Sequence, residues 1–263
     1  MNSSYLLDNA AKETEKRFGA LSTLFDPGTI RHLEGRGVGP GWHCLEVGGG
    51  GGSIAKWLAD RVGSEGRIVA TDIDTRFLDA LKLPSIEVWR HDIVRDSLPE
   101  RSFDLVHARQ VLIHIVDKDR VLQKIIAALK PGGWFIDEEF DAVSLAPDPK
   151  VSPGEVLLKT HLALARLFAD RGFERRYGRL LFARLRAHGL LDVDAEARMF
   201  VCQRGSPGTT ILRANYEQLR EALIKGGYIT AQEFEEDLAR LEDDDFMMPS
   251  SILWSAWGRR PLA

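Results

Sequence analysis

The sequence predicts a doubly wound α/β fold with a mostly parallel sheet, and two observations carry this prediction. Short apolar runs typical of buried strands alternate with amphipathic helical segments through the first half of the chain. A run of five glycines, Gly48 to Gly52, separates the first apolar run from the first helical segment. Strands that alternate with helices are joined by right-handed crossovers, which make the strands parallel in one sheet and place helices over its faces.

The individual elements follow from the same patterns. Short apolar runs predict strands over 43–47, 67–71, 86–90, 103–108 and 134–140. Apolar residues at helical spacing predict helices over 9–24, 53–62, 75–82 and 117–129, the last one stopped by a Pro-Gly-Gly turn. Beyond the fifth strand, helical patterns cover 154–171, 178–188, 208–225 and 231–243, with strands expected over 191–201 and 250–257. We therefore expect a sheet with an inserted helical cover.

The chain contains no internal repeat and no Pro- or Ser-rich linker, which favours a single domain over the whole of 1–263. Within it we expect an N-terminal helical lid over 1–36 and a ligand-binding core over 37–141. The inserted helices and last strands, over 142–263, would cover the substrate.

Composition excludes several classes of protein. The 263 residues include 35 Lys plus Arg and 39 Asp plus Glu, a net charge of −4, which does not favour nucleic-acid binding. No run of 18 or more apolar residues occurs, so we expect no membrane span. The two cysteines, Cys44 and Cys202, form no CxxC pair, which argues against a disulfide framework or a zinc site. Because the N-terminus is polar, without an apolar signal segment, we expect a cytoplasmic protein.

The glycine run can be matched to two kinds of nucleotide site. A dinucleotide-binding loop needs G-x-G-x-x-G, but Ser53 stands where the third glycine would be. The pattern that fits is G-x-G-x-G, at Gly48, Gly50 and Gly52, with Glu46 two positions before it. In a doubly wound sheet this loop opens at the carboxyl ends of the strands, where ligands bind.

An acid, one hydrophobic residue and G-x-G-x-G together resemble the first motif of the class I S-adenosylmethionine-dependent methyltransferases. Two later motifs of that family are also matched: an acid at the end of the second strand, Asp72 followed by Ile73, and the pair Asp92-Ile93 after the third. The resemblance covers roughly 40–140 and is closest to enzymes of the small-molecule, ubiquinone and natural-product type. It implies a seven-stranded Rossmann-like sheet.

The same resemblance implies S-adenosylmethionine as cofactor and S-adenosylhomocysteine as product. Asp72 would hold the ribose hydroxyls, and Asp92-Ile93 would contact the adenine. The charge of the loop fits this ligand independently. A sulfonium with an α-amino group is cationic and has no phosphate, so it needs carboxylates around the loop, and Glu46, Asp72 and Asp92 supply them.

Candidates for the chemical step are few. His107 and His114 flank the loop after the fourth strand, where a histidine can take a proton near neutral pH, and Glu139 after the fifth strand is a rival base. Arg109 could instead bind the carboxylate of the cofactor. Metal-dependent members of the family that this sequence resembles carry acids after the fourth strand. Because the fourth strand here ends in His107-Ala108-Arg109, we expect no metal.

Three questions stay open at this point. The N-terminal helix could place Tyr5 and Arg17 over the cofactor, or it could be an ordinary surface helix. The acceptor is expected to be a small organic molecule, secondary-metabolite or quinone-like, methylated on O, C or N, and a homodimer is compatible with the sequence. The alternatives are an NAD-dependent Rossmann oxidoreductase and a repurposed protein that binds S-adenosylmethionine without methylating.

Overall fold

The computed structural model describes residues 14–143 and 158–262. The chain divides into two compact units, each described here by itself. The sheet unit comprises Phe25–Phe140, Tyr177–Ala197 and Leu253–Ala263, and the helical unit comprises Met1–Leu24, Asp141–Arg176 and Arg198–Ile252, in both cases within the described residues. The single domain over 1–263, with its inner boundaries at 36 and 141, stays a prediction.

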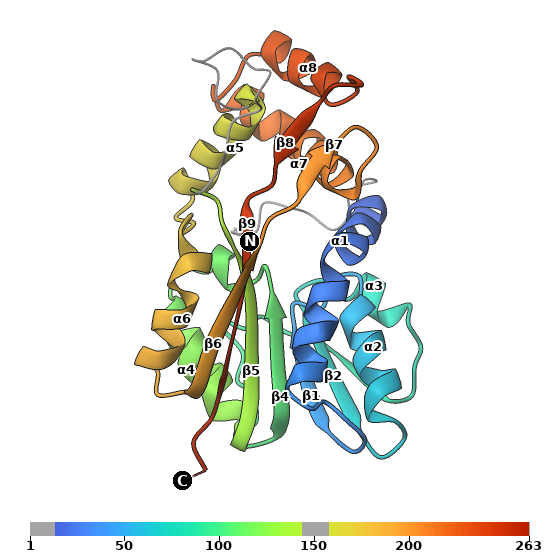
Figure 1. Cartoon of the computed structure of the whole chain (residues 1–263), viewed down its shortest axis with the longest axis vertical. Helices are drawn as coiled ribbons and strands as arrows, with labels where there is room; N and C mark the ends of the chain where they lie inside the picture. Colours follow the sequence, from blue (N-terminus) through green and yellow to red (C-terminus); the bar gives the residue numbers. More distant parts are fainter. Residues whose placement is uncertain (1–13, 144–157, 263) are drawn as a thin grey trace. The chain divides into compact units, whose positions relative to one another are not determined.

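The sheet unit is built on seven strands (Figure 1). They are β1 (His43–Val47), β2 (Arg67–Asp72), β3 (Ile86–Arg90), β4 (Phe103–Arg109), β5 (Leu129–Asp141), β6 (Leu191–Arg198) and β9 (Ile252–Arg259). Their order is β3-β2-β1-β4-β5-β9-β6. The pairs from β3 through β5 are all parallel.

Strand β9 runs antiparallel to β5. The backbone N–H of Arg260 donates to the carbonyl of Gly133, whereas the Ser255 hydroxyl donates to Glu138, so residue numbers rise along one strand and fall along the other. The predicted fold class, a doubly wound seven-stranded and mostly parallel Rossmann-like sheet, is confirmed.

Helices cover both faces of this sheet (Figure 1). They are α1 (Thr14–Gly35, of which the part from Phe25 belongs to this unit), α2 (Ser53–Val62), α3 (Arg76–Asp79), α4 (Lys118–Ala128) and α6 (Tyr177–Ala187), with the short 3₁₀ helix η1 (Leu112–His114) after β4. One core packs β1, β4 and β5 against α4 and α6; it includes Leu45, Val106, Phe135, Leu122 and Leu181. The other packs the opposite face against α1 and α2; it includes Cys44, Leu105, Ile136, Leu33 and Leu58.

Because side chains alternate along a strand, the two cores assign each polar strand residue to a face. The α1–α2 face carries Glu46, His107 and Glu138. Each of them lies two residues beyond a core residue of the same strand: Cys44, Leu105 and Ile136, respectively. Asp137 and Glu139 lie on the α4–α6 face, with Phe135. The consecutive acids of β5 therefore point to opposite sides of the sheet.

The helical unit has its own core. Its elements are the start of α1, α5 (Lys159–Asp170), α7 (Pro207–Lys225), α8 (Ala231–Arg240) and an antiparallel pair, β7 (Val201–Gln203) and β8 (Met247–Pro249). Leu164, Leu167, Tyr216, Leu219 and Phe234 are among the buried residues that form this core. The apolar positions of α5 thus pack mainly inside their own unit.

Several expected elements differ from the structure. The helix expected over 9–24 continues to Gly35 in α1, and the one expected over 75–82 is the single turn α3. The strand expected over 191–201 is two strands, β6 in the seven-stranded sheet and β7 paired with β8. The Pro-Gly-Gly turn belongs to the first part of β5, where its register with β4 shifts between Phe103 and Leu105 and Gly132 has a φ of +80°. This irregularity lets the chain enter the sheet directly after α4.

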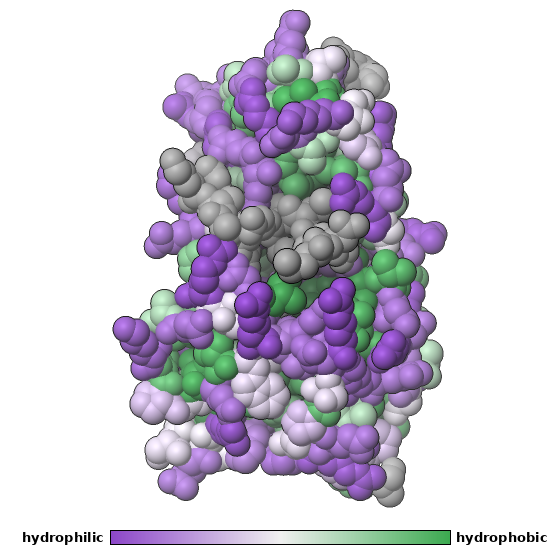
Figure 2. Space-filling model, turned by 180° about the vertical axis from the view of Figure 1, so that it is seen from behind, coloured by the Kyte–Doolittle hydropathy of each residue, from purple (hydrophilic) through white to green (hydrophobic). Residues whose placement is uncertain are grey.

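The face in Figure 2 is mostly hydrophilic, with hydrophobic side chains in scattered groups. Large exposed apolar residues of the described chain include Val116, Met199 and Leu262, which lie in separate segments outside the helices and strands. Within residues 14–143 and 158–262, no helix combines the length and the apolar character that a membrane crossing requires.

Candidate functional site

The glycine loop between β1 and α2 has a backbone that only glycine adopts without strain. Gly48, Gly50 and Gly52 have φ angles of +66°, +50° and +77°. A Cβ at position 48 would lie 2.4 Å from a methyl carbon of Val111, and one at position 52 would lie 2.6 Å from a methyl carbon of Leu81. Three of the five glycines are thus fixed by backbone conformation, and two of these also by neighbouring side chains.

Asp72, at the end of β2, is joined to this loop. Its Oδ2 accepts the backbone N–H of Gly50 at 2.9 Å, and its Oδ1 accepts that of Asp74 at 3.0 Å. Burial raises the pKa of the Asp72 carboxyl above its ordinary value, and these hydrogen bonds oppose the rise. Ile73, the next residue, is 42% exposed. The structure thus brings Gly50 and Asp72 together, as the sequence predicts.

The predicted adenine pair lies beside β2. The backbone N–H of His91 donates to the carbonyl of Asp72 at 2.8 Å, which places the residue after β3 next to the end of β2. Asp92 accepts the backbone N–H of Val94 at 3.0 Å and lies 3.3 Å from the Arg95 guanidinium. Ile93 is buried in the α4–α6 core.

Glu46 and His107 form a contact that sequence reasoning missed. They stand at the same register of the paired strands β1 and β4, and His107 Nδ1 lies 2.8 Å from Glu46 Oε2. On its other side, His107 Nε2 lies 3.4 Å from Glu138 Oε2 of β5. The imidazole has no exposed surface and bridges two carboxylates.

The two carboxylates decide the charge of this ring. Burial alone would lower the pKa of His107, but the charge of Glu46 and the hydrogen bonds to Glu138 and Glu46 outweigh burial and raise it to about 9. The pKa of Glu138 is lowered, because the hydrogen bond and charge of His107 outweigh its burial. The ring is therefore an imidazolium at neutral pH, enclosed by protein, and this placement argues against His107 as the predicted base.

Arg109, expected at the carboxylate of the cofactor, contacts helix α1. Its Nη1 lies 2.9 Å from Asp26 Oδ1 and donates to Thr29 Oγ1 at 3.0 Å, both on α1. Thr29 in turn donates to Glu138. These contacts fasten α1 to the ends of β4 and β5, and a role for Arg109 at the carboxylate of the cofactor stays a prediction.

Glu139, on the other face, holds the loop after β4. Its Oε1 accepts the backbone N–H groups of Val111, Leu112 and Ile113 at 3.0, 2.6 and 3.2 Å. Burial raises the pKa of Glu139 to about 8 against these hydrogen bonds. Asp137 is also fully buried, and neither of its oxygens has a hydrogen-bond partner among the described residues. His114, the remaining predicted base, ends η1 in this same loop and is half-buried.

The predicted lid residues are only partly described. Tyr5 lies outside the described residues. Arg17, near the start of α1, is 6% exposed, and its Nε donates to Asn215 of α7 at 2.9 Å. That contact lies within the helical unit, and a role for Arg17 at the cofactor stays a prediction.

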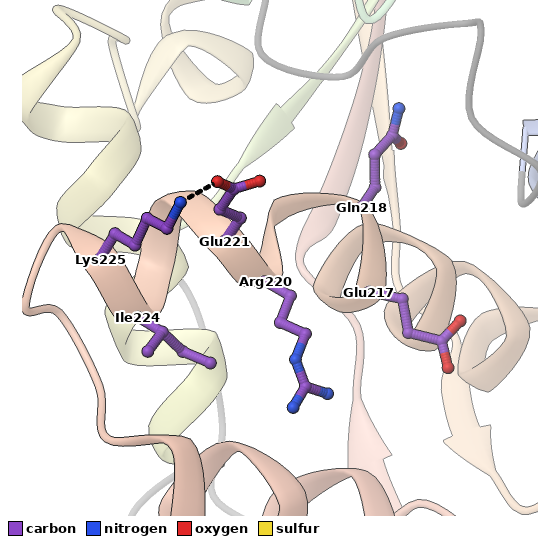
Figure 3. A pocket seen from close by; sticks show the side chains of 6 residues that line it. All are labelled: Glu217, Gln218, Arg220, Glu221, Ile224 and Lys225. Atoms are coloured by element: carbon purple, nitrogen blue, oxygen red, sulfur yellow. Dashed lines mark hydrogen bonds and ion pairs between the residues drawn. The ribbon is translucent and has the colours of Figure 1, made fainter.

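A surface hollow of about 430 Å³ lies along α7 (Figure 3). It is lined by Glu217, Gln218, Arg220, Glu221, Ile224 and Lys225. Lys225 and Glu221 form an ion pair with each other, and Arg220 pairs with Glu235 of α8. Since its charged side chains already pair, we assign no ligand to this hollow. In the described part of the chain, no group of three or more His, Cys, Asp or Glu residues is arranged to hold a metal.

Comparison with known proteins gives one consistent result. Residues 45–144 match a family described as a methyltransferase domain. A ubiquinone/menaquinone biosynthesis C-methyltransferase of Hydrogenovibrio crunogenus is 32% identical over 123 residues, or 43% of this chain and 48% of the relative. One from Xylella fastidiosa is 37% identical over 115 residues, or 41% and 46%. The aligned part of the chain thus spans about half the length of the curated relatives it matches.

Among solved structures, phosphoethanolamine N-methyltransferase 2 of Haemonchus contortus aligns with a TM-score of 0.61 at 17% identity. The alignment covers 99% of this chain and 61% of that protein. A Bacillus subtilis protein, YcgJ, aligns with a TM-score of 0.59 at 14% identity, covering 90% of this chain and 99% of that one. At such low identity these structures support the fold alone.

Proposed function

We propose that this chain, which carries a class I S-adenosylmethionine-dependent methyltransferase domain, transfers a methyl group from S-adenosylmethionine to a small organic acceptor. The observation that carries the proposal is the glycine loop with Asp72 hydrogen-bonded into it. This loop lies at the carboxyl ends of parallel strands, where doubly wound sheets bind their ligands.

The side chains around the loop fit the cofactor. The neighbouring strand ends carry the carboxylates of Glu46 and Asp72, and positive φ angles at Gly48 and Gly50 let a ligand approach the backbone closely. A carboxylate accepts about four hydrogen bonds, so Asp72 retains capacity for two ribose hydroxyls beside its two backbone contacts. A dinucleotide could also use Asp72 for its ribose, but its pyrophosphate would come close to the carboxylate of Glu46 beside the loop, which disfavours the oxidoreductase alternative.

We assign the cofactor roles accordingly. Asp72 binds the ribose hydroxyls and Glu46 the α-ammonium group. The exposed side chain of Ile73 covers one face of the adenine, and Asp92 contacts its amino group, with Ile93 supporting the site from the core. When bound, S-adenosylmethionine supplies an electrophilic methyl group on a cationic sulfur, and the protein aligns acceptor and methyl and excludes water.

His114 is the strongest remaining candidate for a general base. His107 is enclosed between two carboxylates, and one oxygen of Glu139 accepts three backbone N–H groups. His114 lies in the loop that Glu139 holds, directly after β4. If the acceptor loses a proton, replacing His114 should lower kcat about 100-fold or more with cofactor affinity unchanged.

The acceptor class rests on the relatives. The curated relatives named above act in ubiquinone and menaquinone biosynthesis, according to their names. We propose a quinol-like or secondary-metabolite-like acceptor for this chain, and neither nucleic acid nor membrane as partner. An acidic net charge of −4 agrees with a small-molecule acceptor.

The test is methyl transfer itself. Purified protein is incubated with methyl-labelled S-adenosylmethionine and sets of quinols, phenols and amines, and acceptor-dependent S-adenosylhomocysteine is measured, with Asp72→Ala as the binding-deficient control. The proposal expects turnover with at least one acceptor class and none with the control. Binding of S-adenosylhomocysteine without turnover on any acceptor would favour the repurposed cofactor-binding protein, and absence of binding would reject the whole assignment.

A further inference from the structure

His107 links Glu46 to Glu138, and neither His107 nor Glu138 has a role in the function proposed above. His107 has no exposed surface, so it cannot touch an acceptor. Two buried carboxyl groups and one buried imidazolium nevertheless carry a large desolvation cost, which burial of apolar side chains of the same size would avoid. The arrangement therefore calls for an explanation beyond packing.

The two carboxylates are held very differently. Glu138 is engaged at both oxygens, since Oε1 accepts the Ser255 hydroxyl at 2.5 Å and Oε2 faces Thr29 and His107. Glu138 is thus anchored by α1, β9 and β4. Among the described residues, in contrast, the carboxylate of Glu46 has a hydrogen bond with His107 alone, through Oε2.

The position of Glu46 gives this difference a meaning. It precedes Gly48, the first glycine of the loop, by two residues, and about 6% of its side chain remains exposed. An anchored Glu138 fixes the imidazole, and the imidazole fixes Oε2 of Glu46, which leaves Oε1 as the oxygen available to a ligand. The charged groups around His107 are Glu46 from β1, Glu138 from β5 and, near Glu138, Arg109 from β4 with Asp26 from α1.

We propose that His107 is a positioning residue, which orients the Glu46 carboxylate toward the α-ammonium group of the S-adenosyl ligand. This inference rests on the function proposed above. A protonated ring donates to both carboxylates and sets the direction of Glu46 before the ligand arrives. Preorganisation of this kind improves affinity for the part of the ligand that Glu46 contacts.

Two ligands separate positioning from general structural damage. S-adenosylhomocysteine carries the α-amino group, whereas 5′-methylthioadenosine shares the adenosine part and has no amino-acid part. Calorimetric dissociation constants are measured for both ligands with the wild type and with His107→Gln. We expect His107→Gln to weaken S-adenosylhomocysteine by about tenfold or more, and 5′-methylthioadenosine by less than twofold.

Two further variants serve as controls for His107→Gln. His161→Gln replaces another buried histidine, which contacts Tyr216 in the helical unit, and should change neither constant. If His107→Gln does not fold, Glu138→Gln loosens the far anchor and should give the same selective loss at smaller size. Equal losses for both ligands, or no loss for either, overturn the positioning role. A wild type that binds neither ligand rejects the proposed function instead.

Discussion

At the scale of single residues, Gly48 is the position where sequence pattern and structure coincide most closely. Its φ of +66° costs an L-residue about 1–2 kcal/mol, and a Cβ there would overlap Val111 at 2.4 Å. Gly48→Ala should therefore destabilise the fold by more than backbone strain alone and weaken cofactor binding.

The matched control for that variant is Gly189→Ala, after α6. Gly189 also has a positive φ, +81°, but a Cβ there would meet nothing within 4 Å. Denaturant unfolding of the two variants separates strain from overlap. Equal free energies of unfolding would show that the Val111 contact relaxes and has no bearing on the loop.

Asp72 gives a second prediction at this scale. Asp72→Ala removes the acceptor of the Gly50 N–H together with the proposed ribose contacts, so affinity for S-adenosylhomocysteine should fall by about 1–3 kcal/mol. Asp74→Ala, which removes a neighbouring acid that pairs with Arg76, is the control and should leave affinity nearly unchanged. Calorimetric titration measures both, and an unaltered affinity for Asp72→Ala would remove it from the ribose site.

At the scale of elements, the central feature is the loop after β4, held by Glu139. Its carboxylate accepts three consecutive backbone N–H groups, from Val111 to Ile113. Glu139→Ala leaves these donors without their acceptor, so their amide hydrogens should exchange faster with solvent. Glu139→Gln keeps one acceptor oxygen and should retain most of the protection.

Hydrogen exchange followed by mass spectrometry on peptides covering 110–115 measures this difference. Peptides from α8, in the helical unit, serve as an internal reference because the substitution lies in the sheet unit. If both variants exchanged like the wild type, the loop would be held by its own 3₁₀ turn rather than by Glu139.

The sequence predicted the elements well where periodicity is strong. The ranges 43–47, 53–62 and 86–90 coincide with β1, α2 and β3. Short elements were not predicted, because three residues such as Met247–Pro249 are too few to show a periodic pattern of apolar residues. The break between β6 and β7 was missed for a related reason, since both halves of 191–201 favour a strand and only tertiary pairing separates them.

The site was predictable to the extent that it is local in the chain. The glycines and Asp72 could be named from motif and spacing. The bridge through His107 could not, because it depends on the register between β1, β4 and β5. That register pairs Glu46 with His107 and places Glu138 two residues beyond the partner of His107 on β5. Strand alternation does show afterwards that Glu138 and Glu139 face opposite sides, and this signal could have separated their roles.

At the scale of the whole molecule, His107 makes stability depend on pH. Its pKa in the folded protein, about 9, lies above the ordinary 6.5, so the stabilisation is fully present below about pH 6.5 and is lost as pH rises through 9. The loss should be on the order of 3 kcal/mol, following from the size of that shift.

Urea unfolding of the wild type and of His107→Gln at pH 7 and pH 10 tests this dependence. Other groups titrate in the same range in both proteins, so the informative quantity is the difference between their free energies of unfolding. We expect the free energy of unfolding of the wild type to exceed that of His107→Gln by less at pH 10 than at pH 7. A difference that stays constant would contradict this account, because the ring would then keep one protonation state from pH 7 to pH 10.

The most direct test of the central claim is thermal unfolding of the purified wild type with S-adenosylhomocysteine and, separately, with NAD(H). A ligand at about 100 times its dissociation constant stabilises the folded state by about 2.7 kcal/mol, which raises Tm measurably. The account predicts a raised Tm with S-adenosylhomocysteine and an unchanged Tm with NAD(H). A rise with NAD(H) alone would contradict it, because the glycine loop would then hold a dinucleotide.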